Sequence, residues 1–233
     1  MKYRHEIKYL IDLKDYYTLK SRLSGILKPD IHAGHDNCYH IRSVYFDDDK
    51  NTDFISKLSG LSERKKYRIR MYNADTAYIR LEKKIKSNDV SYKLSARITK
   101  KEADSFLQSD FRSENFHENQ LIEEFCLTNS LNILKPNVIT DYDREAYLFD
   151  AGNVRVTLDT NLKTAMLNTD FFNRDLPMVP AIGSHQVILE VKYDAFLPSI
   201  ISGLLSTTNG IQMAISKFAL CKRFITLNDW EVQ

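Results

Sequence analysis

The stretch RKKYRIRMY, residues 64–72, decides the fold, because charged and apolar side chains alternate along it. Lys66, Arg68 and Arg70 fall at every second position, with Tyr or Ile between them. A β-strand places alternate side chains on opposite faces, so this stretch predicts a strand with one basic and one apolar face. The alternation favours a strand over a nucleic-acid-binding patch or a targeting signal, which need no such spacing.

The same spacing recurs along the chain in six further stretches. Polar or charged residues stand at i and i+2 positions, with mostly apolar residues between them, at Glu6 and Lys8; Arg80, Glu82 and Lys84; Lys93, Ser95 and Arg97; Tyr142 and Arg144; Arg155, Thr157 and Asp159; and Glu190 and Lys192. One such strand is ordinary in an antiparallel sheet, where the polar face meets solvent. Seven of them, rich in Arg and Lys, favour a shared surface that binds a polyanion.

Composition limits the class of protein. The 233 residues are 43% hydrophobic and 27% charged, which is typical of globular proteins, and we expect a single domain over residues 1–233. The net charge of +2 lacks the overall basic character common in nucleic-acid-binding proteins, so no nucleic-acid partner is expected. Any binding of anions must therefore come from local clustering of basic residues.

Cysteine usage and hydropathy indicate a reducing compartment. Cys38, Cys126 and Cys221 are odd in number and form no CxxC pair, which argues against a disulfide framework and a structural zinc site. The N-terminal stretch has no apolar signal segment, and the most apolar later stretch, residues 196–205, is too short to span a bilayer. The chain is therefore expected to be cytoplasmic, without direct membrane insertion.

Hydrophobic periodicity predicts a chain that alternates between strands and helices. Strands are predicted at residues 3–11, 39–47, 65–72, 78–86, 91–98, 138–149, 154–159 and 186–194. Helices are predicted at residues 12–26, 52–58, from 99 onward, 118–131, 197–206 and 214–226, and turns at residues 73–75, 88–89 and 150–153.

The predicted helices decide which way the charged faces point. If these faces pointed outward, the apolar faces would fill a barrel, and the amphipathic helices would have nothing to cover. If the charged faces point inward, the apolar faces lie outside, where four or five helices can bury them. About eight strands suffice for a closed barrel that holds side chains or one small ligand. We therefore expect an α+β fold: a closed eight-stranded antiparallel β-barrel, or tunnel, with a charged lumen and flanking helices.

Nine segments in sequence order carry a resemblance to a known family. They are YRHEIKYLI, RSVYFDD, KYRIRMY, LEKKIK, SYKLSARI, YDREAY, VRVTLDTNL, LEVKYD and SKF, and they extend from residue 3 to about residue 224. Together they resemble the polyphosphate polymerase (vacuolar transporter chaperone, VTC) domain of the triphosphate tunnel metalloenzyme (CYTH-like) superfamily. Each motif alone is short, and their shared order makes the match specific.

The resemblance implies a function and a set of residues. It implies an eight-stranded tunnel that binds ATP and triphosphate or polyphosphate with basic side chains and Mn²⁺ or Mg²⁺, and that transfers the γ-phosphate of ATP to a polyphosphate chain. The phosphate-binding residues implied are Lys8, Arg68, Arg70, Lys84, Lys93, Arg144, Arg155, Lys192 and Lys217, with hydroxyl contacts from Tyr142 and Ser216. Glu190 is the implied metal ligand, with Glu6 and Glu82 as further candidates.

One position departs from the wider superfamily. Its hydrolytic triphosphatases begin with E-x-E-x-K, whereas this chain has Arg4 where the first glutamate would stand. The departure favours the polymerase-like branch over a two-metal hydrolase. The chain also lacks the regulatory domain and the membrane helices of the eukaryotic polymerase, so a membrane partner would be a separate protein.

Alternative interpretations of the charged residues and of the tunnel stay open at this point. The glutamates can form cross-strand ion pairs with the lysines instead of binding metal, and Lys217 can be a solvated helix lysine. The same tunnel can serve a triphosphatase or nucleoside triphosphatase that uses water, or a non-catalytic polyphosphate-binding module. The six histidines show no metal-binding spacing, and the cysteines have no nearby base, so nucleophilic catalysis by Cys or Ser has little support.

Overall fold

The computed structural model describes residues 4–34, 36–87, 90–110, 119–132, 134–166, 168–206 and 208–228. Eight long strands are β1 (His5–Asp12), β3 (Cys38–Asp47), β4 (Arg64–Tyr72), β5 (Ile79–Ser87), β6 (Val90–Ile98), β7 (Lys135–Phe149), β8 (Val154–Thr164) and β10 (Gln186–Tyr193). Three two-residue strands are β2 (Lys28–Pro29), β9 (Val179–Pro180) and β11 (Ile211–Gln212). The helices are α1 (Leu13–Ile26), α2 (Thr52–Leu58), α3 (Lys100–Leu107), α4 (Gln120–Asn132), α5 (Ser199–Leu205) and α6 (Lys217–Asn228). Four residues of the predicted elements lie outside the described residues, namely 3, 88, 89 and 118.

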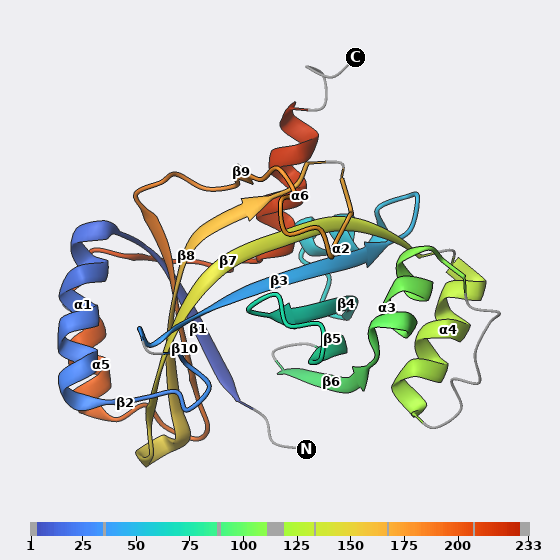
Figure 1. Ribbon diagram of the computed structural model, residues 1–233. Coiled ribbons are helices and arrows are strands. Elements are labelled where there is room, and N and C mark those ends of the chain that lie inside the picture. The colour runs from blue at the N-terminus through green and yellow to red at the C-terminus, as the bar shows by residue number, and fades with distance from the viewer. Residues whose placement is uncertain are drawn as a thin grey trace.

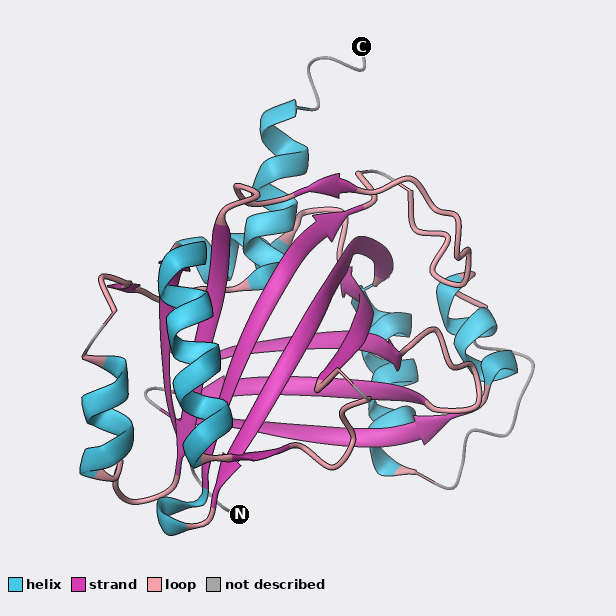
Figure 2. Cartoon of the chain, turned by 60° about the vertical axis from the view of Figure 1, so that its left-hand side comes forward, coloured by secondary structure: helices cyan, strands magenta, loops and turns pink. Residues whose placement is uncertain are grey.

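The strands form one antiparallel sheet in an α+β fold, as predicted. The sheet has 11 strands in the order β11-β1-β10-β8-β7-β3-β4-β5-β6, with β2 beside β7 and β9 beside β8. Within the described residues no ladder joins β6 back to β1, so the predicted closed barrel is not found as a continuous ring of hydrogen bonds. The sheet is nevertheless strongly curved, as Figure 2 shows, and its two sides are called here the concave and the convex face.

Four helices cover the convex face in two separate places (Figure 1). α1 and α5 lie side by side over β1, β8 and β10, where Leu19 and Leu23 of α1 are fully buried. α3 and α4 cover β4, β5 and β6, and Phe106 and Phe125 of these helices pack with their ring centroids 5.2 Å apart. The prediction that helices bury the apolar side of the sheet is therefore confirmed for α1, α3, α4 and α5.

The helix α6 departs from that prediction because it packs on the concave face. Its Phe218 and Cys221 are buried against Tyr142 and Ile188, which lie on that face. The ring of Phe218 also lies 5.1 Å from Tyr45 and 6.1 Å from Phe54 of α2. The concave face thus has an apolar end under α6 and a charged remainder.

Local sequence signals explain where the elements begin and end. The carboxylate of Asp12 accepts a hydrogen bond from the backbone N–H of Asp15 and caps α1. Thr99 and Glu102 form a capping box at the start of α3. Between β7 and β8, Gly152 has a φ of +73°, and a Cβ atom there would lie 2.6 Å from the carbonyl oxygen of Phe196. The predicted turn at 150–153 therefore requires glycine.

None of the described helices is both long enough and apolar enough to cross a lipid bilayer.

Candidate functional site

The ladders of the sheet bring the candidate strand residues to one face. Residues that pair directly across a ladder lie on the same side of a sheet. Lys8 pairs with Glu190, which pairs with Thr157 on its other side, and Glu6 pairs with Lys192. The registers of the remaining strands continue this face to β6, and it carries Glu6, Lys8, Arg68, Arg70, Glu82, Lys84, Lys93, Tyr142, Arg144, Arg155, Glu190 and Lys192.

Glu82 of β5 is a fully buried carboxylate surrounded by cations. Its side chain lies 2.6 Å from the guanidinium of Arg68 and 3.9 Å from that of Arg70, and it accepts a hydrogen bond from Lys93. Burial alone would raise the pKa of Glu82, but Arg68, Arg70 and Lys93 lower it far below its usual range. One carboxylate therefore orients three predicted phosphate-binding side chains.

Hydroxyl groups hold the two arginines of β4 in place. Arg68 donates a hydrogen bond of 2.7 Å to the hydroxyl of Tyr45. Arg70 donates to Ser43 Oγ at 3.0 Å and to the hydroxyl of Tyr142 at 3.3 Å. A guanidinium fixed in this way is preorganised to bind phosphate oxygens in pairs.

A second cluster joins β1 and β10 around the ammonium of Lys8. Lys8 Nζ lies 2.7 Å from the carboxylate of Glu6 and 3.3 Å from that of Glu190, and it donates to the carbonyl of Ile215 at 3.0 Å. Lys192 also contacts Glu190, at 2.5 Å. Burial opposes ionisation of both acids, yet Lys8 and the neighbouring lysines lower the pKa of Glu6 to about 2 and that of Glu190 well below its usual value.

One ion pair connects the two halves of the curved sheet. Lys84 of β5 lies 3.3 Å from the carboxylate of Glu6 on β1, although these strands are far apart in the strand order. The sheet therefore curves far enough for β5 and β1 to face each other across the concave side. Burial and the nearby Lys8 lower the pKa of Lys84.

Asp159 of β8 is the central residue of a third cluster. It is fully buried, and both of its carboxylate oxygens accept hydrogen bonds from Arg144, at 2.6 and 2.7 Å. Lys217, the first residue of α6, lies 2.5 Å from the same carboxylate. The sequence placed Asp159 on the charged face but did not identify it as a site residue. The available signal was its spacing from Thr157 and Arg155.

Ser216 and Lys217 reach the site from the start of α6. Lys217 Nζ lies 4.7 Å from the ring centroid of Tyr142, so this lysine is placed among the predicted residues and is not a solvated helix lysine. Ser216 Oγ accepts a hydrogen bond of 3.4 Å from the backbone N–H of Ala219. The hydroxyl therefore faces the first turn of its own helix, a position typical of an N-cap.

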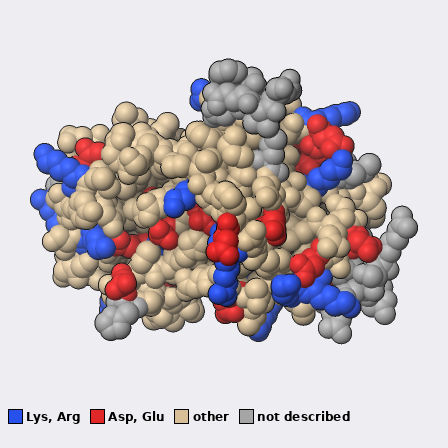
Figure 3. All heavy atoms as spheres, turned by 45° about the horizontal axis from the view of Figure 1, so that its top comes forward, with Lys and Arg blue, Asp and Glu red and all other residues tan. Residues whose placement is uncertain are grey.

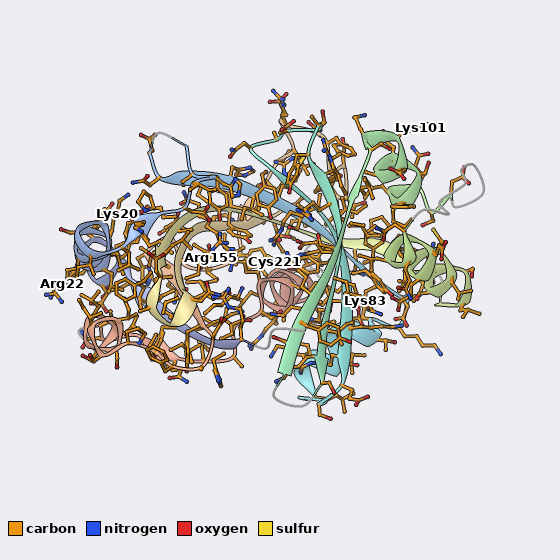
Figure 4. The ribbon with its side chains drawn as sticks, turned by 90° about the horizontal axis from the view of Figure 1, so that it is seen from below. Lys20, Arg22, Lys83, Lys101, Arg155 and Cys221 are labelled. Carbon is orange, nitrogen blue, oxygen red and sulfur yellow. The ribbon has the colours of Figure 1, made fainter. Side chains whose placement is uncertain are left out.

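Arg155 lies on the same face, but its side chain is held by residues outside the three clusters. Its guanidinium donates to the buried carboxylate of Asp30 at 2.6 Å and to the hydroxyl of Tyr39 at 2.8 Å. Figure 4 shows Arg155 inside the curve of β7 and β8, whereas Lys20 lies on α1 outside it. Arg155 is thus separate from the clusters around Glu82 and Glu190.

Arg4, the departure from the E-x-E-x-K pattern, contacts the residue that follows the C-terminal end of β10. Its Nε lies 3.1 Å from the carboxylate of Asp194, and it donates to the carbonyl of Asn153. Arg4 therefore replaces a carboxylate without adding an uncompensated cation to the concave face.

The concave face has more basic than acidic side chains. The predicted basic set is Lys8, Arg68, Arg70, Lys84, Lys93, Arg144, Arg155, Lys192 and Lys217, and the carboxylates that contact it are Glu6, Asp30, Glu82, Asp159 and Glu190. By contrast, basic and acidic side chains are interspersed on the outer surface seen in Figure 3. The excess of positive charge is therefore a property of the lining, in agreement with the small net charge of the chain.

The donor set on β1, β8 and β10 fits a divalent cation of the Mg²⁺ or Mn²⁺ kind. Glu6 and Glu190 are both ionised and meet around one ammonium. Thr157, paired with Glu190, has a buried Oγ1 that lacks a hydrogen-bond partner among the residues that the structure describes. These are the oxygen ligands that such cations prefer, with phosphate oxygens completing the shell. Glu82 belongs to a different cluster, and the described residues contain no group of three or more His, Cys, Asp or Glu side chains arranged to hold a metal ion by themselves.

Comparison with solved structures gives distant likenesses. A putative adenylate cyclase from Bacillus halodurans is 16% identical with a TM-score of 0.47, covering 88% of each chain. The protein PH1819 from Pyrococcus horikoshii is 12% identical with a TM-score of 0.45, covering 93% of this chain and 97% of that one. A chain of the Schizosaccharomyces pombe Mediator head module is 10% identical with a TM-score of 0.50, covering 91% of this chain and all of that one. At these identities the likeness concerns the fold alone.

Family comparison gives a firmer result. No curated protein matches the chain. The sequence profile of the VTC domain, however, matches residues 3–224, which is nearly the whole chain. The matched region contains β1 to β10, where the clusters around Glu82, Glu190 and Asp159 lie, and the first residues of α6. The chain therefore belongs to the VTC domain family.

Proposed function

We propose that this protein is a polyphosphate polymerase-like phosphotransferase, which moves the γ-phosphate of ATP onto a polyphosphate chain. The observation that carries the proposal is the excess of preoriented basic side chains along the concave face. Condensed phosphates carry about one negative charge per phosphate, so a lining with many cations and few carboxylates suits them. Membership of the VTC domain family supports the same function.

The curved sheet would act as a tunnel in this reaction. The contact between Lys84 and Glu6 supports this part of the proposal, since it draws β5 and β1 together over the concave side. A phosphate chain lying there would be surrounded by the clusters of Glu82, Glu190 and Asp159. Such an enclosure excludes water from the reacting phosphate, which favours transfer over hydrolysis.

Phosphoryl transfer needs positioning and charge neutralisation more than covalent help from the protein. A terminal oxygen of the polyphosphate chain attacks the γ-phosphorus of ATP, the bond to the bridging oxygen breaks, and ADP leaves. Arg68 and Arg70 would hold the transferred phosphate in line, while Lys217 and Arg144 would bind the neighbouring phosphates. A divalent cation held by Glu190 and Glu6 supplies further neutralisation of phosphate charge when bound.

The proposal is tested by incubating the protein with ATP and Mn²⁺ or Mg²⁺, and resolving the products by size and by phosphorus NMR. ADP together with chains longer than three phosphates is the expected result, and Arg70→Ala and Glu190→Ala are expected to abolish both. Orthophosphate as the only new phosphate product would contradict the proposal and indicate a triphosphatase. Tight, metal-independent binding of polyphosphate without turnover would instead indicate a binding module.

A further inference from the structure

Lys66 of β4 differs from the other basic residues on the concave face. It stands two residues before Arg68 on the same side of the strand and pairs across the ladder with Lys84. Its Nζ is buried, and it lacks a hydrogen-bond partner in the described part of the chain. The ring of Phe218, in the first turn of α6, lies 4.1 Å from this nitrogen. The amine is therefore held against an aromatic ring in place of a carboxylate.

The acids nearest to Lys66 do not neutralise it fully. Asp47 accepts backbone hydrogen bonds from Asp48, Asp53 and Phe54, at 3.0, 2.9 and 3.1 Å, and is thereby committed to the start of α2. Asp53 attracts Lys66, but burial and the neighbouring Asp47 raise the pKa of Asp53 to about 7. This acid is therefore only partly ionised near neutral pH.

Cations also face Lys66 from the elements around it. Arg64 on its own strand and Lys57 of α2 both repel it, Lys84 stands opposite on β5, and Lys217 precedes Phe218 on α6. Burial, opposed by Asp53 and reinforced by Arg64, lowers the pKa of Lys66 to about 7. An ammonium in such surroundings is costly, and Met or Leu would fill the space beside Phe218 and Tyr45 at lower free energy.

We propose that Lys66 is a phosphate-contacting residue, which extends the row of Arg70 and Arg68 toward α6 and binds condensed phosphate as an ammonium. The inference rests on the proposed function, because it requires the concave face to bind condensed phosphate. A same-face spacing of two residues is about 7 Å along a strand, so an anion held by Arg68 extends within reach of the flexible side chain of Lys66. The negative charge of the anion supplies the partner that the resting amine lacks.

A consequence follows for proton balance. In the free protein a large part of the Lys66 population is neutral above pH 7, whereas the phosphate-bound form is an ammonium. Binding of condensed phosphate therefore takes up a proton at Lys66. Arginine at this position would stay charged throughout, and methionine would carry no charge at all.

Calorimetric titration with tripolyphosphate at pH 8, in two buffers of different ionisation enthalpy, measures this proton. The wild type is expected to take up roughly half to one more proton per tripolyphosphate than either Lys66→Arg or Lys66→Met. The protonation change of tripolyphosphate itself is common to all three proteins and cancels in the comparison. Lys66→Met is expected to bind about tenfold more weakly at pH 7, and Lys66→Arg within about threefold of the wild type.

Two controls keep the outcomes distinct. Asp53→Asn removes the other group that titrates near pH 7, and it is expected to retain the proton uptake of the wild type. Thermal unfolding of each variant verifies that it is folded. Equal proton uptake in the wild type, Lys66→Arg and Lys66→Met, or unchanged affinity in Lys66→Met, overturns the inference while polyphosphate synthesis still stands. Absence of tripolyphosphate binding in the wild type overturns the inference and the proposed function together.

Discussion

Arg144 and Glu145 are neighbours on β7, yet they belong to opposite faces and to two different kinds of ionic cluster. On the concave side, Arg144 shares the carboxylate of Asp159 with Lys217. On the convex side, Glu145 accepts hydrogen bonds from the hydroxyls of Tyr16 and Tyr147 and pairs with one lysine, Lys20, at 2.8 Å. The convex cluster is balanced in charge and ties α1 to the sheet. The concave cluster keeps a positive charge in excess.

The same contrast occurs three strands away from β7 in the sheet, at Glu82 and Lys83 of β5. Glu82 faces three cations on the concave side, whereas Lys83 pairs with Glu124 of α4 on the convex side. Both faces therefore bury charged residues, and burial alone does not mark a binding site. The two faces differ in the number of cations that share each carboxylate. Several cations share one carboxylate in the proposed anion-binding lining, whereas one cation pairs with one carboxylate in the contacts that stabilise the fold.

The largest expected effect compares two buried glutamates on opposite faces. Glu190→Gln should lower the rate of phosphoryl transfer by about 10²–10³-fold, because it removes a carboxylate proposed to hold the metal. Glu145→Gln should leave the rate within about twofold and lower the free energy of unfolding by about 1–3 kcal/mol. Rates with ATP and Mn²⁺, and urea denaturation of both variants, measure these effects. A loss of activity in Glu145→Gln comparable to that in Glu190→Gln would remove the distinction between the faces.

The next effect concerns stability on β5. Glu82→Gln leaves Arg68, Arg70 and Lys93 without their carboxylate and should lower the free energy of unfolding by about 3 kcal/mol. Lys83→Met, which keeps the contact with the ring of Tyr67, should change it by less than about 1 kcal/mol.

Thermal unfolding with and without tripolyphosphate extends the comparison of Glu82→Gln with Lys83→Met. An anion that replaces the missing carboxylate should raise the unfolding temperature of Glu82→Gln more than that of the wild type or of Lys83→Met. Equal increases in all three proteins would show that the anion does not bind beside Glu82.

A third effect, which appears only when the pH changes, concerns Asp53, a carboxylate that lacks an excess of cations. Its pKa in the folded protein, about 7, lies above the value near 4 of an unfolded chain, because of burial and the nearby Asp47. The folded state thus binds more protons between these values, and stability from this group is lost as the pH rises through 7.

Asp53→Asn does not titrate and should therefore equal the wild type in stability near pH 4. At pH 8 it should be more stable by up to about 4 kcal/mol, because each pKa unit between about 4 and about 7 corresponds to about 1.4 kcal/mol, as measured by urea denaturation across this range. A constant difference between the two proteins at all pH values would contradict the assigned pKa.

The alternation of charge predicted the faces of the strands because that signal is local. Together with hydrophobic periodicity, it placed the eight long strands, α1 and α2 close to their observed positions, although β7 begins three residues earlier than predicted and β8 ends five residues later. The two-residue strands β2, β9 and β11 are too short to show any period. Pro136 lies inside β7, beside a register shift between Tyr45 and Phe46, two residues before the predicted start of this strand at 138. Proline is tolerated at such an irregularity near the start of a strand.

Features that depend on distant partners were not predictable. Asp159 shares its face with Arg155, but its importance comes from Arg144 and Lys217, which belong to other elements. The apolar stripe of α6 indicates that the helix is buried, without indicating which face of the sheet it covers. Closure of the sheet likewise depends on its two end strands, and strand count alone led to the prediction of a closed barrel.

The pairing of β1 with β10 has a consequence for the timing of synthesis. The strand at residues 5–12 aligns along its whole length with residues 186–193, so it leaves the ribosome long before its partner exists. At 5–20 residues per second this interval is roughly 10–40 s. The pair of Lys8 and Glu190 forms only afterwards, and a chain with so many long-range contacts folds slowly. The proposed phosphate site is therefore absent from the nascent protein and can form only when synthesis has passed β10.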